Sequence, residues 1–508
     1  MSDFMNALKN TLVKSDSNLI RTENGALGYK TTGKALLDLN FAVSSMRNWP
    51  DKDIVAKFAD ACAENLDNAV VWLFFARDAR QGMGERRLFR VCVRYLADNF
   101  PEVCDKVLSL VAEYGRWDDI FEVFDTKVHE KAVEIVCGQL VADLKAAQKG
   151  ESVSLLAKWL PSINSHNWKT REKATKIARY IGLNRFDYQK LCSKLRKHIN
   201  LVESKMSAGK WDEIDYEAVP SKANLVYNTA FFRHDEDRRR EFLSRVKDGE
   251  AKINASVVFP YEIVSKYEYG WFGRDIQPDD TLEAMWKALP NYVTDGASTL
   301  VVADGSGSMT CGVGSSGVTA LDVANSLAIY FAERLTGAFH NTYITFSSRP
   351  QIVQLGDGTL ASKLTIAYQH DECSNTNIEA TFDLILDTAV DNKMKQEDLP
   401  RNILIVSDME FDSATYSYGR SPANESLFST ISSRFEEKGY QMPRLIFWNV
   451  NSRTGAIPLT ENPNGIALVS GFSPAVAKMV LSGELDPLNV LLETLHSERY
   501  TPVWDALK

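Results

Sequence analysis

The segment DGSGSM, residues 304–309, places one aspartate and two serines at alternate positions directly after the apolar run TLVVA. In a strand such alternation aims the three side chains to one side, and the two glycines end the strand at this point. Asp304, Ser306 and Ser308 are therefore predicted to lie in a loop at the end of a buried strand, with their oxygens turned towards one point. Carboxylate and hydroxyl oxygens without nitrogen or sulfur suit a hard cation such as Mg²⁺ or Mn²⁺.

Two later segments also have an oxygen-bearing side chain next to them. Asp408 comes directly after the apolar run NILIVS, and Thr376 stands before the helical segment NIEATFDLIL. Binding crevices of parallel sheets lie at the carboxyl ends of the strands, where these oxygens are expected to meet. The predicted Mg²⁺ or Mn²⁺ ligands are Asp304, Ser306, Ser308, Thr376 and Asp408. For the glycine–serine motif taken alone, a flexible turn without a metal is the alternative.

Two other chemistries fit this region less well. Residues 312–317, GVGSSG, match a dinucleotide-binding pattern, but the predicted strand NTYITFSS ends in serines where that site needs an acid. A metal-dependent phosphotransfer enzyme with Asp304 as its nucleophile stays an alternative. Dehalogenase-type phosphatases place a second aspartate two residues further on, and that position is Ser306 here. We predict a protein that is not an enzyme.

The pattern of apolar residues divides the chain into two parts. From residue 297 on, apolar β-branched runs alternate with helical segments, which is typical of a mostly parallel sheet covered on both faces. Between about residues 35 and 295 the pattern is helical, and stacked helix pairs are the expected packing. One stripe at helical spacing runs through Leu191, Leu195, Ile199, Val202 and Met206. The predicted fold is an all-α helical-repeat (HEAT-like) domain, residues 1–295, followed by an α/β doubly wound (Rossmann-like) domain with a helical tail, residues 296–508.

Basic residues gather in one part of the helical region. Residues 168–210 hold 12 Lys and Arg against 3 Asp and Glu, in a chain of net charge -9. Four aromatic residues lie between them, Trp168, Tyr180, Phe186 and Tyr188. Amines on a shared helical face can neutralise successive phosphates while the rings stack on unpaired bases. This concentration favours nucleic acid as the partner, and a solvated helix face is the alternative.

The composition points to a cytoplasmic protein without a membrane anchor. No run approaches the roughly 20 apolar residues of a membrane span, and the first ten residues, MSDFMNALKN, contain no apolar signal core. The seven cysteines are widely spaced and form no C-x-x-C motif, which is typical of reduced thiols. The seven histidines show no paired spacing, so transition-metal catalysis is not expected.

The order D-x-S-x-S, then a threonine, then an aspartate on a later strand resembles the metal-ion-dependent adhesion site (MIDAS) of von Willebrand factor A domains. The order of strands and helices from 297 to about 483 also resembles that fold. The resemblance implies that Ser306, Ser308 and Thr376 bind the metal through their hydroxyls, and that Asp304 and Asp408 reach it directly or through water. In that family a partner's carboxylate often fills the open position.

Longer phrases, among them ARDARQGMGERRLF (76–89), YGRWDDI (114–120) and SLLAKWLPSINSHN (154–167), resemble an uncharacterised family of plants, phages and large DNA viruses. That family is similar to the Ro 60 kDa autoantigens, in which a helical TROVE module is combined with a von Willebrand factor A domain. The resemblance implies binding of single-stranded or small structured RNA. The candidate RNA contacts are Lys169, Arg171, Lys173, Lys176, Arg179, Lys190, Lys194, Arg196 and Lys197. A protein–protein scaffold whose metal captures an acidic residue of its partner is the first alternative.

Overall fold

The structure of the chain is a computed structural model that falls into two compact units. It describes residues 18–267, 276–293, 298–314, 317–346, 349–371, 377–412, 427–460, 464–477 and 486–508. The sheet unit comprises Met1–Leu66 and Val258–Thr494, and the helical unit comprises Asp67–Val257 and Leu495–Lys508. This division differs from the single boundary at 295/296 because helices on both sides of the helical segment pack with the sheet.

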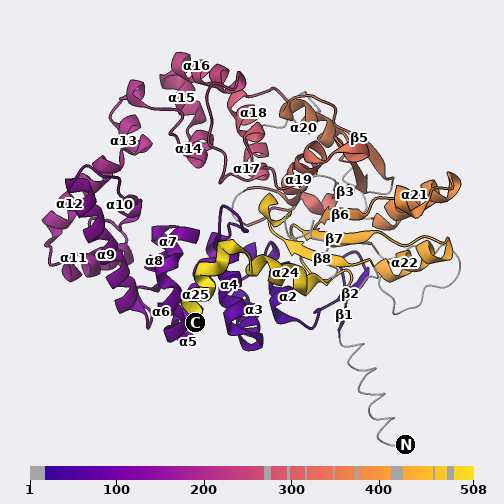
Figure 1. Ribbon diagram of the computed structural model, residues 1–508, viewed down its shortest axis with the longest axis horizontal. Helices are drawn as coiled ribbons and strands as arrows, with labels where there is room; N and C mark the ends of the chain where they lie inside the picture. Colours follow the sequence, from indigo (N-terminus) through magenta and orange to yellow (C-terminus); the bar gives the residue numbers. More distant parts are fainter. Residues whose placement is uncertain are drawn as a thin grey trace, which may run out of the picture. The chain divides into compact units, whose positions relative to one another are not determined.

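The sheet unit is built on six strands in the order β5-β4-β3-β6-β7-β8 (Figure 1). They are β3 (Thr299–Asp304), β4 (Thr342–Phe346), β5 (Gln351–Gln354), β6 (Asn402–Ser407), β7 (Arg444–Asn449) and β8 (Ile466–Ser470). Among the described strands of this six-stranded sheet, β4 and β5 pair in antiparallel fashion and the other neighbours pair in parallel. The chain continues from β3 to one side of the sheet and from β6 to the other, so the strand order reverses between these neighbours. A crevice opens at the carboxyl ends of strands at such a switch point.

Helices cover both faces of this sheet. They include α19 (Ala320–Arg334), α20 (Leu360–Gln369), α21 (Ile378–Asp391) and α22 (Leu427–Glu437). On β7, the ring of Phe447 contacts Phe428 of α22 with centroids 4.8 Å apart, whereas its neighbour Trp448 contacts Phe331 of α19 at 5.5 Å. Successive strand residues point to opposite faces, so α22 and α19 lie on opposite sides. The predicted doubly wound α/β sheet is confirmed.

Residues from the start of the chain complete the sheet unit. They form β1 (Leu19–Arg21), β2 (Leu27–Tyr29), α2 (Ala35–Phe41) and α3 (Asp51–Glu64), and the unit also holds α17 (Pro260–Val264), α18 (Asp280–Lys287) and most of α24 (Pro487–Leu495). The N–H of Tyr29 donates to the carbonyl of Ile457 at 2.9 Å. The amide of Asn449, at the end of β7, donates to the carbonyl of Phe41 at 2.9 Å. The β1–β2 hairpin departs from the all-α prediction because three-residue strands are too short to show an alternating pattern.

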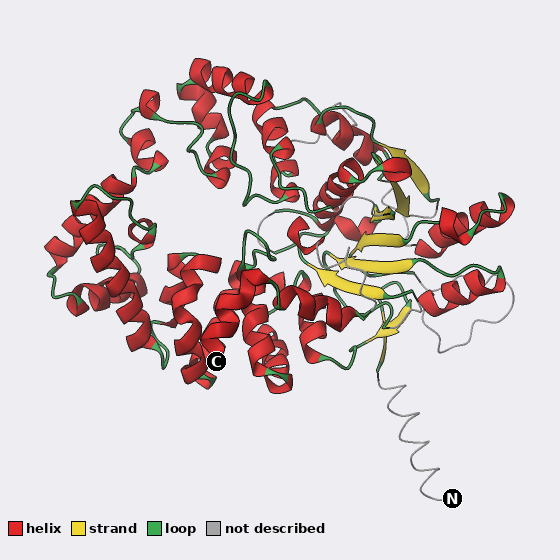
Figure 2. Ribbon diagram, viewed as in Figure 1, coloured by secondary structure: helices red, strands yellow, loops and turns green. Residues whose placement is uncertain are grey.

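The helical unit consists of helices and loops in the part of the chain that the structure describes (Figure 2). Its helices are α4 (Leu66–Arg77), α5 (Arg86–Asn99), α6 (Pro101–Val107), α7 (Val111–Tyr114), α8 (Trp117–Ile120), α9 (His129–Gln148), α10 (Leu156–Trp159), α11 (Trp168–Tyr180), α12 (Arg185–Ile199), α13 (Val202–Ser207), α14 (Ser221–Val226), α15 (Asn228–His234), α16 (Glu236–Lys247) and α25 (Thr501–Leu507). This confirms the predicted helical region. No helix within the described ranges is both long and apolar enough to cross a bilayer.

One predicted helix is wrong in its extent. The apolar stripe from Leu191 to Met206 predicts a single helix, but α12 ends at Ile199 and α13 begins at Val202. Between them Asn200 adopts a left-handed conformation with φ 57° and ψ 49°. Asparagine tolerates this conformation at the end of a helix better than most residues, so the chain turns there despite the continuing apolar spacing.

We expect Asn449→Ala to lower the free energy of unfolding of the sheet unit by about 1–3 kcal/mol, because it leaves buried hydrogen-bonding groups unpaired. The side chain of Asn449 is 1% exposed and also accepts a hydrogen bond from the N–H of Ser452 at 2.8 Å. Chemical denaturation measures the change. The matched control is Asn392→Ala, since Asn392 is exposed. Equal effects of the two substitutions would contradict a role for Asn449 in holding the N-terminal segment.

Candidate functional site

Asp304 ends β3, and its carboxylate is held by the loop after β3 and by the last residue of the neighbouring strand β6. Its Oδ1 accepts a hydrogen bond from the N–H of Ser306 at 3.0 Å, and its Oδ2 accepts one from the hydroxyl of Ser407 at 2.6 Å. Gly305 passes close to Asp371, since a Cβ at position 305 would lie 3.1 Å from the carboxylate Oδ1 of that residue. A glycine therefore lets the chain turn tightly directly after β3.

The hydroxyls of Ser306 and Ser308 face each other, with their Oγ atoms 3.0 Å apart. Mg²⁺ holds oxygen ligands at about 2.1 Å in an octahedron, so two adjacent ligands lie about 3 Å apart. Ser308 also hydrogen-bonds the carboxylate of Asp408. Ser306 is buried and Ser308 is half-buried, so Ser308 is the one of the two that lies nearer to solvent. The two serines fit adjacent positions around a hard divalent cation.

Asp408 follows β6 and is fixed by its own loop and by an arginine. Its Oδ1 accepts a hydrogen bond from the N–H of Glu410 at 3.2 Å, and its Oδ2 accepts one from Nη1 of Arg453 at 2.9 Å. Met409, between the two acids, has a φ of 62°. Such a conformation costs a residue other than glycine about 1–3 kcal/mol and is found mainly where surrounding contacts impose it.

Burial strongly affects the two carboxylates. Asp304 and Asp408 are both 0% exposed. Burial, together with repulsion from Asp408, raises the pKa of Asp304 to about 7. Burial also raises the pKa of Asp408, although the guanidinium of Arg453 opposes this rise. A divalent cation beside both groups would favour their ionised forms, so the donor set fits such an ion.

Three residues that the sequence pattern does not identify, Arg453, Asp371 and Asn325, surround this site. Arg453 joins Asp408 to Glu23, because its Nη1 donates to Asp408 and its Nε donates to Oε2 of Glu23 at 2.7 Å. Asp371 accepts a hydrogen bond from the amide of Asn325 at 2.7 Å, and burial raises the pKa of this carboxyl to about 7. No motif identifies these residues, because each lies in a different segment and only the folded chain brings them near the strand ends.

Glu410 is the most heavily hydrogen-bonded of the acids near the site. It is 0% exposed, and its carboxylate accepts hydrogen bonds from three backbone N–H groups, those of Glu23 at 2.9 Å, Arg453 at 2.8 Å and Thr454 at 2.8 Å. The hydroxyls of Ser452 and Thr454 donate to it as well. Glu410 therefore joins the loop after β6, the loop after β7 and the N-terminal segment.

Four of the five predicted metal ligands lie at the ends of β3 and β6, namely Asp304, Ser306, Ser308 and Asp408. Thr376 falls in the range 372–376, outside the described residues. Within the described ranges no group of three or more His, Cys, Asp or Glu side chains is placed to hold a metal. The candidate set contains two carboxylates, and the hydroxyls supply its remaining oxygens.

The nine predicted RNA contacts lie on α11 and α12 but differ in exposure. Six are exposed, Lys169, Arg171, Arg179, Lys190, Lys194 and Lys197, and three are half-buried, Lys173, Lys176 and Arg196. Arg196 donates to the carbonyls of Ala157 at 2.8 Å and Leu160 at 3.0 Å. Lys176 pairs with Glu172 at 3.2 Å, and burial lowers the pKa of Lys173. The half-buried group therefore makes contacts within the fold.

Three exposed lysines on α12 differ from the half-buried group in having no described contacts of this kind. Lys190, Lys194 and Lys197 form no side-chain hydrogen bond or ion pair with any residue that the structure describes. Their spacing of four and three residues places them on one side of the helix. Their ammonium charges are not compensated within the described fold.

Three of the four aromatic residues in this segment face solvent. The exposed fractions are 61% for Trp168, 58% for Tyr180 and 68% for Phe186. The fourth, Tyr188, is 1% exposed and donates its hydroxyl to the carbonyl of Pro161 at 3.0 Å. Among the described residues, these three are the exposed large aromatic side chains. Phe186 lies on α12 with the uncompensated lysines, and Trp168 and Tyr180 lie on the preceding helix α11.

Known proteins resemble this chain in both units. A family model described as a domain of unknown function, DUF2828, matches residues 123–296, and a second one, DUF7788, matches residues 298–498. An uncharacterized protein of Acanthamoeba polyphaga mimivirus is 27% identical over 96% of this chain and 89% of its own length. Among solved structures, the Ro (RSR) protein of Deinococcus radiodurans shows a TM-score of 0.45 and 14% identity, covering 85% of this chain and 93% of that one.

We expect Glu410→Gln to lower the free energy of unfolding of the sheet unit by about 2 kcal/mol, because the amide NH₂ would face donors that now point at a carboxylate oxygen. Thermal and chemical denaturation measure this loss. Glu397→Gln is the matched control, since Glu397 is exposed and pairs only with Lys395 within the described contacts, at 3.4 Å. The assigned role of Glu410 is wrong if both variants unfold like the unaltered protein.

Proposed function

We propose that this chain is an RNA-binding protein of the Ro type, in which α11 and α12 hold an unpaired stretch of RNA. The observation that carries the proposal is the coincidence of uncompensated lysines with the exposed large aromatic rings of the described chain. The sequence resemblance to the family related to Ro autoantigens agrees with it.

Charge supports nucleic acid as the partner. Residues 168–210 have a net charge of +9, although the whole chain has a net charge of -9. Exposed ammonium groups without a carboxylate beside them bind phosphates and release the counterions that surround a nucleic-acid strand. An acidic chain with one concentrated basic surface directs such a partner to that surface.

The exposed rings favour single strands over duplexes. Burying a large aromatic side chain stabilises a fold by roughly 1.5–3 kcal/mol, so rings such as Trp168 and Phe186 contribute little to folding where they stand. Stacking an unpaired base on such a ring contributes about 1–3 kcal/mol. Bases in a duplex are already stacked on each other and are not available in this way.

We also propose that the sheet unit binds Mg²⁺ or Mn²⁺ through Ser306, Ser308 and Asp408, with Asp304 beside them. The separation of the two serine oxygens, 3.0 Å, and the two buried carboxylates support this assignment. When bound, the ion supplies an open position that can take a carboxylate of a partner protein. Arg453 supplies a positive charge to Asp408 at the same site and opposes binding of the ion.

Binding rather than catalysis is the proposed role of Asp304. A carboxylate that attacks a phosphoryl group needs an accessible oxygen with a free lone pair directed at phosphorus. Asp304 is 0% exposed, and both of its oxygens already accept hydrogen bonds, from Ser306 and Ser407. These contacts suit a group that joins the loop after β3 to the end of β6 better than they suit a nucleophile.

The charge-reversal variant Lys190→Glu, Lys194→Glu and Lys197→Glu tests the RNA proposal. We expect its affinity for a single-stranded RNA oligonucleotide to fall by about tenfold or more, because three phosphate contacts are lost and replaced by repulsion. The slope of log affinity against log salt should become shallower by about 2, at roughly 0.7 for each contact with a single strand. Fluorescence anisotropy over a salt series measures both quantities.

The matched control reverses Lys52, Lys247 and Lys438, which are also exposed and lie outside α11 and α12. This variant should bind RNA with nearly unchanged affinity. Equal losses in the two variants would mean that the net charge of the protein, and not this surface, governs binding. A flat salt dependence of the unaltered protein would instead favour the protein–protein scaffold.

Manganese binding tests the proposed metal site. We expect Ser306→Ala and Ser308→Ala to weaken Mn²⁺ binding by at least about tenfold, since each removes a ligand. Arg453→Gln should strengthen it by about tenfold, because a positive charge next to the ion is removed. Electron paramagnetic resonance of free Mn²⁺ measures the affinities. The control is Thr310→Val, which removes an exposed hydroxyl that donates to the carbonyl of Gly307 and should leave Mn²⁺ affinity unchanged. If neither serine variant changes the Mn²⁺ affinity, the assigned metal site is wrong.

A further inference from the structure

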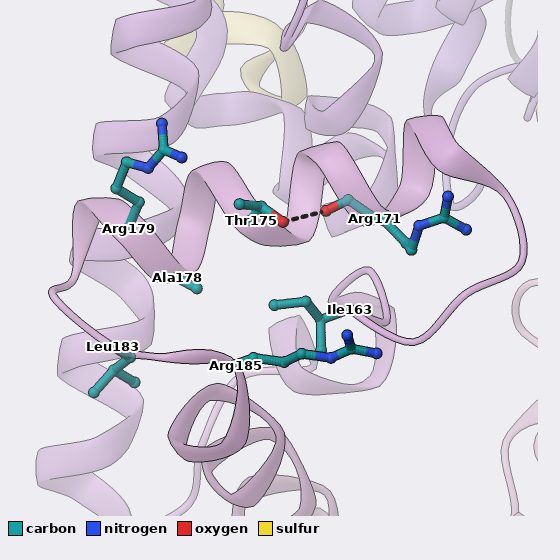
Figure 3. A pocket seen from close by; sticks show the side chains of 7 residues that line it. All are labelled: Ile163, Arg171, Thr175, Ala178, Arg179, Leu183 and Arg185. Carbon is teal, nitrogen blue, oxygen red and sulfur yellow. Dashed lines mark hydrogen bonds between the residues drawn. The ribbon is translucent and has the colours of Figure 1, made fainter.

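A pocket of about 450 Å³ opens between α11 and the segment that leads into α12 (Figure 3). Its volume falls within the range of about 300–1,000 Å³ that small-molecule sites occupy. Ile163, Ala178 and Leu183 supply apolar walls, and Arg171 and Arg185 supply guanidinium groups. In Figure 3 both guanidiniums extend to the same end of the pocket, whereas Ala178 and Leu183 lie towards the other end. The pocket thus has a cationic end and an apolar end.

Neutral groups hold the two arginines in place. Nη1 of Arg171 donates to the carbonyls of Ser165 at 2.7 Å and His166 at 2.8 Å. Nε of Arg185 donates to the side-chain oxygen of Asn164 at 2.9 Å. Carbonyl and amide oxygens orient a guanidinium without cancelling its charge. Each arginine also keeps donors that have no partner among the described residues, Nη2 on Arg171 and Nη1 on Arg185.

The surroundings of the pocket leave its positive charge uncompensated. None of the described residues that line it is acidic. On the two helices, Glu172 pairs with Lys176 at 3.2 Å. Asp187 accepts from the amide of Asn184 at 2.6 Å and forms no ion pair with Arg171 or Arg185 among the described residues. Arg179, another lining residue, is exposed and lies near Ala178 in Figure 3, away from the guanidiniums of Arg171 and Arg185. An anionic group is therefore the ligand that this end of the pocket favours.

We propose that this pocket holds one unpaired nucleotide, with its phosphate between Arg171 and Arg185 and its base against the apolar wall of Ile163, Ala178 and Leu183. Guanidinium groups suit phosphate because their planar arrays of donors match its oxygens. A simple anion would leave the apolar wall exposed to water, whereas the flat face of a base can pack against it. The proposal rests on the RNA-binding role of α11 and α12 and names the part of the RNA that one site receives.

Adenosine monophosphate and a single-stranded RNA oligonucleotide are the two probes of this proposal, used with the full-length protein. Arg171→Gln with Arg185→Gln removes the cationic end of the pocket. Lys190→Gln with Lys194→Gln is the matched control, which removes the same charge from α12 outside the pocket. Thr175→Met fills the pocket from an exposed lining position and leaves every arginine in place. Circular dichroism melting confirms that each variant is folded.

We expect adenosine monophosphate to bind the unaltered protein and the lysine variant equally, and to bind the arginine variant and Thr175→Met at least about tenfold more weakly. For the oligonucleotide, the lysine variant should reduce the salt slope by about 1.4, at roughly 0.7 per contact, and the arginine variant by about 0.7, because both arginines hold the same phosphate. Thr175→Met should weaken oligonucleotide binding without changing that slope. Isothermal titration calorimetry and fluorescence anisotropy measure these effects.

The other outcomes distinguish a failure of the pocket proposal from a failure of the proposed RNA-binding function. Nucleotide binding that survives in both the arginine variant and Thr175→Met overturns the pocket, and RNA binding that still depends on the lysines leaves the proposed function intact. Nucleotide binding without any RNA binding supports the pocket as a site for free nucleotides and removes the proposed function. Inorganic phosphate that competes as well as adenosine monophosphate reduces the site to an anion site and overturns the nucleotide assignment.

Discussion

Two carboxylates are buried at the neighbouring ends of β3 and β6, and the need to compensate their charge shapes the sheet unit around them. An isolated buried carboxylate would take up a proton rather than remain charged. An N–H and a hydroxyl oppose the rise in pKa that burial causes at Asp304, and an N–H, a hydroxyl and the guanidinium of Arg453 oppose it at Asp408. These groups come from the end of β6 and from the loops after β3, β6 and β7, which lie together because β3, β6 and β7 are neighbouring parallel strands.

The same requirement draws the start of the chain into the sheet unit. Arg453 pairs with Glu23 as well as with Asp408, and the backbone N–H of Glu23 donates to Glu410. A buried carboxylate such as Glu410 needs several donors; the loop after β7 supplies most of them, and Glu23 adds one from a distant segment. Backbone N–H groups from two distant segments meet this need. The result is that a hairpin near the chain start, more than 380 residues from Glu410, belongs to the same compact unit.

The sequence predicts those features that local pattern determines. Continuous apolar runs identify the parallel strands, and the glycines after Asp304 mark where the first of these strands ends. The charges at Lys190 and Lys194 are visible in the same way, since exposed lysines at helical spacing need no tertiary contact. Arg453 was not predictable, because its role depends on the pairing of β6 with β7 rather than on its neighbours. Asn200 was missed for a related reason, since one left-handed residue ends a helix without altering its apolar spacing.

In the proposed RNA-binding surface, arginines and lysines have different roles because their side chains differ in chemistry. A guanidinium carries five donors in a rigid plane, so Arg171 can bond two loop carbonyls and still offer donors to a ligand. An ammonium group is a compact point charge on a flexible stem, and Lys194 makes no such contact with the described residues. Positions that must orient a ligand therefore suit arginine, whereas positions that only attract a strand suit lysine. On this basis the pocket would decide how a strand lies, and the lysines of α12 would supply most of the salt-dependent affinity.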